Sequence, residues 1–150
     1  MKYAKHSAPS LGAQALGYGG LIPFVGLALV SGLWPTHQAI AASALLGYSA
    51  TIVSFLGAIH WGLAMRDANG QSPSVLLWGV VPSLLAWFGL QLPVAHGLML
   101  TAVVLWICFA VDRVVYTRFG LRTWLPMRLL LTVVASLSCM GSALRVMGFV

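Results

Sequence analysis

Two long stretches of the chain contain no charged side chain. Lys, Arg, Asp and Glu are absent for 60 residues between Lys5 and Arg66, and again for 44 residues between Asp67 and Asp112. A helix needs about 20 residues to cross the hydrocarbon core of a bilayer, so each stretch is long enough for two crossings. The apolar segment after Arg122 supplies a fifth. The pattern therefore predicts an all-α, polytopic membrane helical bundle of about five transmembrane helices.

Turn and helix-breaking residues place the joints between these helices. Trp34 and Pro35 separate the first two spans, the polar segment 66–72 separates the second from the third, and Pro93 precedes the fourth. No linker is long enough to divide the chain, so residues 1–150 are expected to form a single transmembrane domain. The predicted spans are about 14–33, 39–65, 74–92, 95–115 and 124–147.

The composition excludes a soluble fold. Hydrophobic residues make up 60% of the chain and charged residues only 7%, whereas ordinary soluble domains are roughly 25% charged. So few solvating groups cannot cover the apolar surface in water. The net charge of +6 would suit nucleic acid only if the cations clustered on one face, and here they lie at the ends of apolar stretches. The expected partner is therefore the lipid bilayer, and no nucleic acid is expected.

The cations also predict an orientation. Seven of the eight Lys and Arg side chains flank one set of helix ends, and only Arg145 flanks the opposite set. Because Lys and Arg accumulate on the cytoplasmic side of membrane proteins, we expect the N-terminus in the cytoplasm and the C-terminus outside. The first apolar segment has the features of an uncleaved span rather than of a signal or transit peptide. The bacterial inner (cytoplasmic) membrane is the expected location.

One face of the second predicted span consists mostly of small side chains at three- and four-residue spacing. In lipid, such a face lets another helix approach closely. Packing within the chain is one interpretation, and a surface for a second copy or for another membrane protein is the alternative. The residues of this face are Gly47, Ala50, Thr51, Ser54, Gly57, Ala58 and Trp61.

Ionisable side chains at the cytoplasmic ends of three spans form the main candidate site. His60 lies near the end of the second span, Asp112 and Arg113 lie near the end of the fourth, and Arg128 opens the fifth. Ionisable groups inside a membrane usually face the bundle interior and pair with one another. We therefore expect a buried polar cluster of His60, Asp112 and one of the two arginines, with Trp61 beside it.

The sequence leaves two interpretations of this cluster open. In the first, it is a structural tie in which Asp112 pairs with an arginine and with His60. In the second, it is a functional pocket, because an imidazole titrates near neutral pH and a guanidinium binds planar or anionic groups. Such a pocket would suit proton handling, an anionic headgroup or a quinone ring.

Catalytic and metal-binding patterns are not recognisable. No nucleophile stands with a base, no phosphate loop occurs, and two acidic residues in the whole chain cannot supply a catalytic carboxylate pair. His37 and His96 belong to the side opposite the cluster, and two histidines alone make a poor ligand set for zinc or haem. No catalytic residue, metal or cofactor is predicted.

Four strings of the sequence form a further pattern: GLIPF at 20–24, SFLGAIHWG at 54–62, PSLLAW at 82–87 and PMR at 126–128. Together they resemble a small multipass family of unknown function that includes transmembrane protein 69, and the resemblance covers nearly the whole chain. Its most specific part is the string that ends in His60, Trp61 and Gly62. The resemblance implies an inner-membrane protein of about five helices with no assigned reaction, and it supplies no catalytic residues.

These features favour a non-enzymatic accessory or assembly subunit that packs against membrane partners or a second copy. The small-residue face, the short loops and the missing catalytic pattern motivate this expectation. The alternative is a small carrier, or a quinone- or lipid-binding protein, that uses the His–Asp–Arg cluster at the cytoplasmic side. A membrane-embedded enzyme is a third class, and it would need a cofactor.

Overall fold

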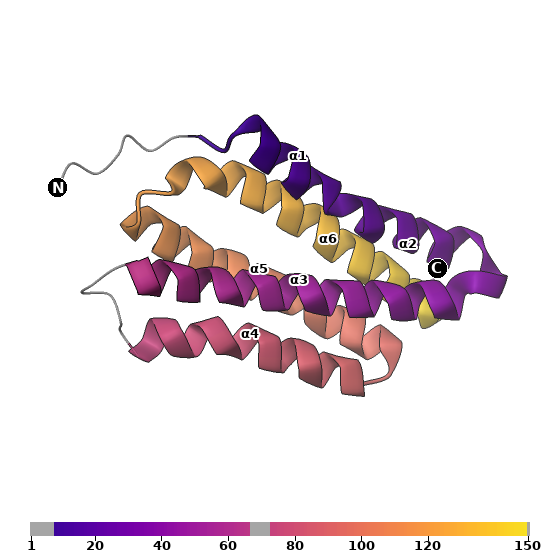
Figure 1. The fold of residues 1–150 in the computed structure, drawn as a ribbon. Helices are drawn as coiled ribbons and strands as arrows, with labels where there is room; N and C mark the ends of the chain where they lie inside the picture. Colours follow the sequence, from indigo (N-terminus) through magenta and orange to yellow (C-terminus); the bar gives the residue numbers. More distant parts are fainter. Residues whose placement is uncertain (1–7, 67–72, 150) are drawn as a thin grey trace.

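The structure, a computed structural model, describes residues 8–66 and 73–149, and these residues form helices joined by short connections (Figure 1). The segment 67–72 and the cations Lys2 and Lys5 lie outside the described residues. The predicted all-α architecture is confirmed. The elements are α1 (Leu11–Gly19), α2 (Leu21–Leu33), the 3₁₀ turn η1 (Pro35–His37), α3 (Gln38–Arg66), α4 (Pro73–Gln91), α5 (Val94–Arg118), the 3₁₀ turn η2 (Arg122–Trp124) and α6 (Leu125–Val146).

Five helical stretches of the described chain are long and apolar enough to cross a membrane, which confirms the predicted number. Each overlaps one predicted span, and the ends differ by a few residues because helical turns continue into the flanking segments. The stretches are Leu11–Leu33, Pro35–Arg66, Pro73–Gln91, Val94–Arg118 and Arg122–Val146.

The first stretch is two helices rather than one continuous span. Pro23 has no N–H, so it cannot donate to the carbonyl of Gly19, and the chain bends between α1 and α2. The hydroxyl of Tyr48 on α3 donates to the carbonyl of Gly20 at 2.9 Å. This bond holds the junction against the bundle, while α1 itself lies over α6 (Figure 1).

Helix α3 is the centre of the bundle. It packs against α2, α4, α5 and α6, and α5 and α6 also pack against each other (Figure 1). Its buried side chains include Leu45 and Val53, which meet Leu98 and Leu105 of α5 in the apolar core. Large apolar side chains cover the outer faces of the other helices. That surface suits a lipid environment, in which apolar groups need no burial within the protein.

Glycines permit two close helix approaches in this bundle. A Cβ at Gly57 of α3 would lie 2.6 Å from the carbonyl oxygen of Gly79 on α4, and a Cβ at Gly97 of α5 would lie 2.5 Å from that of Gly89 on α4. Both distances are shorter than a carbon and an oxygen can tolerate. These glycines therefore allow backbones to approach in a way that no larger residue would.

The small-residue face is thus occupied only in part by packing within the chain. Gly57 meets α4, and the hydroxyl of Ser54 donates to the carbonyl of Ala50 one turn earlier. Ala58 is exposed, and a Cβ at Gly47 would meet nothing within 4 Å. Gly57 packs directly on α4, whereas Gly47 and Ser54 line a hollow between α3 and α4.

Replacing Gly57 tests the close approach of α3 and α4. We expect Gly57→Ala to lower the free energy of unfolding by about 1–3 kcal/mol, because the new methyl group meets a backbone carbonyl that cannot move independently. Gly62→Ala on the same helix is the control, since a Cβ there meets nothing within 4 Å. Unfolding in mixed micelles measures both variants. Equal stability of the two would contradict the tight contact.

Candidate functional site

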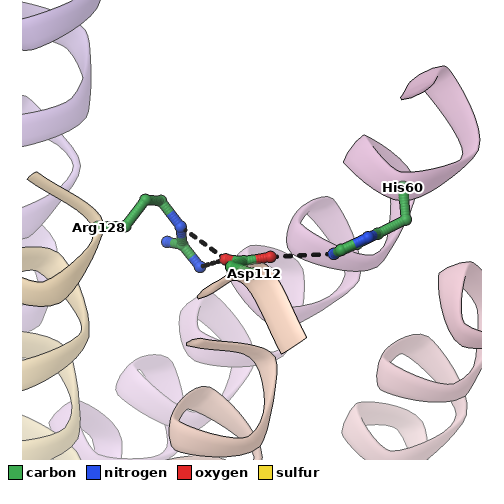
Figure 2. A network of polar contacts seen from close by, with 3 residues as sticks. All are labelled: His60, Asp112 and Arg128. Carbon is green, nitrogen blue, oxygen red and sulfur yellow. Dashed lines mark hydrogen bonds and ion pairs between the residues drawn. The ribbon is translucent and has the colours of Figure 1, made fainter. Parts of the chain in front are cut away.

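Three helices bring His60, Asp112 and Arg128 together at one end of the bundle. His60 comes from the C-terminal part of α3, Asp112 from the C-terminal part of α5 and Arg128 from the first turn of α6 (Figure 2). Their exposed fractions are 1%, 1% and 8%, so all three are buried. In a helical membrane protein, such convergence removes each group from lipid while giving it a partner.

The carboxylate of Asp112 lies between the two basic side chains. His60 Nε2 lies 2.9 Å from Asp112 Oδ1, and Arg128 Nε and Nη2 donate to Asp112 Oδ2 at 2.9 and 2.5 Å. Each carboxylate oxygen therefore has a partner. The mutual attraction offsets a desolvation penalty of several kcal/mol that each buried ion would otherwise carry.

The two ring nitrogens of His60 have different surroundings. Nε2 faces a carboxylate, which only accepts, so Nε2 donates. Among the described residues, Nδ1 of His60 is buried and has no hydrogen-bond partner. Asp112 and Arg128 form an ion pair of opposite charges within the cluster.

Two other predicted site residues lie elsewhere. Arg113 follows Asp112 directly, but consecutive helical residues differ by about 100° around the axis, and Arg113 is exposed. Of the two arginines considered, the structure thus brings Arg128 to Asp112. The indole of Trp61 is turned toward α4, where its Nε1 donates to the carbonyl of Leu76 at 2.8 Å. Trp61 links two helices and does not contact the cluster.

A cavity adjoins the cluster, since Arg128 belongs to its lining. Its volume is about 460 Å³, within the range of roughly 300–1,000 Å³ that small-molecule sites occupy. Helices α1, α2, α3, α5 and α6 form its walls. Its lining is mostly apolar and includes Leu16, Phe24, Phe55, Ile59, Trp124 and Leu131.

Three side chains of the cavity lining carry hydroxyl or guanidinium groups, and they come from the neighbouring helices α5 and α6. Arg128, Thr132 and Tyr116 belong to its lining, so the arginine of the cluster also forms part of the cavity wall. Arg128 and Thr132 are four residues apart on α6, a spacing that puts them on one helix face. That spacing was the available signal in the sequence. The wall that completes the cavity, formed by α1 and α2, could not be inferred from it.

Thr132 has a hydroxyl whose hydrogen bond is missing. It is 1% exposed, and within the described part of the chain its Oγ1 has no partner. A buried helical threonine usually donates to the carbonyl one turn earlier, as Thr101 does to Gly97 at 2.8 Å. Thr132 also belongs to the cavity lining, so its hydroxyl is an unpaired polar group in the wall of the cavity.

The remaining metal-binding side chains are scattered. Across residues 8–66 and 73–149, no group of three His, Cys, Asp or Glu side chains could hold a metal ion. His37 contacts the neighbouring Thr36, and Cys108 and Cys139 are buried free thiols. At the cluster itself, hydrogen bonds and an ion pair join His60, Asp112 and Arg128 beside the apolar cavity.

Five membrane-spanning stretches around a buried Arg–Asp–His cluster define a polytopic membrane protein. The chain belongs to the family DUF3429, which is described as a protein family of unknown function. The model of this family matches residues 10–144. The chain is also similar to transmembrane protein 69 of Xenopus tropicalis, with 33% identity over 138 residues that cover 89% of this chain and 54% of that protein. The chain thus spans about half the length of that relative. These findings confirm the family resemblance, and no solved structure matches the chain.

Removing the charge of Asp112 tests the cluster as a structural tie. We expect Asp112→Asn to lower the free energy of unfolding by about 3–5 kcal/mol, because it leaves the Arg128 guanidinium buried and uncompensated. Adding Arg128→Met should recover part of this loss by removing the unpaired charge. The exposed neighbour provides the control, since Arg113→Gln should change stability by about 0.5 kcal/mol or less. If Asp112→Asn unfolds at the same denaturant concentration as Arg113→Gln, the cluster does not stabilise the fold.

Proposed function

We propose that this protein binds an amphiphilic, membrane-soluble molecule, with the chain of that molecule in the cavity and its polar head at Arg128 and Thr132. One observation carries the proposal, namely an apolar cavity whose few polar side chains, including one with a buried unpaired hydroxyl, come from the neighbouring helices α5 and α6. Small-molecule sites commonly combine an apolar lining with a few convergent polar groups. Of the functions considered from sequence, the lipid- or quinone-binding alternative agrees best with this geometry.

The position of the cavity supports access from the bilayer. Leu16 and Phe55 line the cavity, yet 81% and 63% of their surfaces are exposed on the outside of the bundle. In a membrane, that outside is the hydrocarbon region, so a lipid-like chain could enter sideways without crossing water. Such entry favours a ligand that is already dissolved in the membrane.

The orientation and the location are part of the proposal. Arg66, Arg113, Arg118 and Arg122 belong to the end of the bundle that holds the cluster, whereas Arg145 belongs to the opposite end. This asymmetry supports a cytoplasmic position for the cluster end. The bacterial inner membrane, with the C-terminus outside, is the corresponding assignment.

The expected role as an accessory or assembly subunit stays a prediction. The small-residue face supports it less strongly than the sequence suggested, because Gly57 already meets α4 of the same chain. Ligand binding does not exclude such a role, since a bound lipid can belong to a larger assembly. Size analysis after gentle detergent extraction addresses the question of partners separately.

Filling the cavity tests the proposed function. A photoreactive diazirine on the alkyl chain of hexadecyl acetate or hexadecyl phosphate should label peptides from α1 and α6 that line the cavity. We expect Ala13→Trp to reduce this labelling at least about tenfold, because the indole occupies the space of the chain. Ala15→Trp adds the same bulk to the exposed side of α1 and should leave labelling unchanged.

The peptides are identified by mass spectrometry of the protein in neutral detergent micelles. Labelling that spreads evenly over all exposed helix faces, or that is equal in the two variants, would contradict a specific cavity site.

A further inference from the structure

The guanidinium of Arg128 has donors that Asp112 does not use. It carries five N–H groups, of which one on Nε and one on Nη2 donate to Asp112. The hydroxyl of Tyr116 is a further hydrogen-bond partner of this guanidinium, and at least two N–H groups remain. Arg128 and Tyr116 both belong to the cavity lining.

The charge of Arg128 is already balanced. Its guanidinium pairs with the carboxylate of Asp112, whose other oxygen contacts His60. Among the described residues that line the cavity, Arg128 is the only charged one. An anionic head would compete with Asp112 for Arg128 and would lie near a second buried negative charge. In a medium of low dielectric constant, that repulsion is strong.

Thr132 is an uncharged residue of the same cavity wall. Its hydroxyl lies one helical turn beyond Arg128 and has no partner among the described residues. Arg128 and Thr132 can therefore both donate to an acceptor oxygen, and the described lining holds no cation that lacks an anionic partner. A carbonyl oxygen meets this demand, because it accepts up to two hydrogen bonds and carries no net charge.

From this arrangement we infer that the ligand is an amphiphile with an uncharged, carbonyl-bearing head, held by the spare N–H groups of Arg128 and by the hydroxyl of Thr132. The inference rests on the proposed function and specifies the class of ligand for the same cavity. A buried arginine would first suggest an anionic headgroup. Such a headgroup is disfavoured here because Asp112 already neutralises the charge of Arg128.

Competition between matched probes tests the head. Diazirine-bearing hexadecyl acetate and hexadecyl phosphate have the same chain, but the first has a neutral carbonyl and the second is anionic at neutral pH. We expect the acetate to label the cavity peptides at a concentration about tenfold lower than the phosphate. Unlabelled hexadecane should compete about tenfold less well than unlabelled hexadecyl acetate.

Decylubiquinone as a further competitor distinguishes a quinone carbonyl from the carbonyl of a lipid ester. Stronger competition than by the acetate assigns the ligand to quinones, and weaker competition assigns it to lipid esters.

The outcomes separate the inference from the proposed function. Equal labelling by both probes, or preference for the phosphate, overturns the uncharged head but leaves a cavity that binds amphiphiles. Equally effective competition by hexadecane likewise overturns a role for the head. Failure of both probes to label the cavity overturns the proposed function and the inference with it.

A variant of Thr132 tests the hydroxyl without removing the cluster. Thr132→Val keeps the shape of the side chain, and we expect it to weaken binding of hexadecyl acetate about 3- to 10-fold, the effect of one lost hydrogen bond. It should leave competition by hexadecane unchanged. It should also raise the Tm of the empty protein, because it removes an unpaired buried hydroxyl. Thr101→Val is the matched control, since its hydroxyl is paired within α5 and lies outside the cavity lining.

If Thr132→Val lowers the Tm and weakens the binding of all probes equally, Thr132 acts on packing alone. That result would overturn the assigned contact. Unchanged acetate binding in Thr132→Val would overturn it as well. Higher Tm with selectively weaker acetate binding is the combination that supports it.

Discussion

The carboxylate of Asp112, buried between an arginine and a histidine, constrains the rest of this bundle. A lone carboxylate at this depth would cost several kcal/mol, so the fold must deliver partners to both oxygens. The partners come from different helices, Arg128 from α6 and His60 from α3, while the carboxylate comes from α5. Hydrogen bonds of 2.9 Å leave little freedom of depth or rotation. The cluster thereby sets the register of three helices that apolar contacts alone would leave free to slide.

The structural and functional interpretations of the cluster are compatible. Asp112 holds one edge of the Arg128 guanidinium, and the cavity adjoins the same side chain. A residue positioned by a buried ion pair is a well-ordered donor for a ligand, because its conformational freedom has been lost during folding. The bend between α1 and α2 contributes equally, since it lets α1 lie across α6 and complete the wall of the cavity.

Packing elsewhere follows the rules of a lipid environment. Because lipid tails are as apolar as leucine, helices gain little by hiding apolar side chains from them, and close approach supplies the packing instead. Gly57 and Gly97 provide that approach to α4, and hydroxyl groups such as those of Ser31 and Ser142 pair across helices at 2.9 Å. Large apolar residues therefore lie both in the core and on the outer surface of the bundle, and glycines and hydroxyl groups mediate close contacts between its helices. Its family and its similarity to transmembrane protein 69 agree with this architecture.

The sequence by itself determined the number of crossings, their approximate limits and the all-α class, because absence of charge over 60 residues admits no other fold in lipid. It also indicated that His60 and Asp112 would meet, since both lie at comparable depth near helix ends. Tertiary structure decided the choice of Arg128 over Arg113, the turn of Trp61 toward α4, and the residues that line the cavity. These features depend on the rotation of each helix about its axis and on which helices are neighbours. Uniformly apolar helices carry almost no periodic signal for either property, because lipid and protein interior select the same residues.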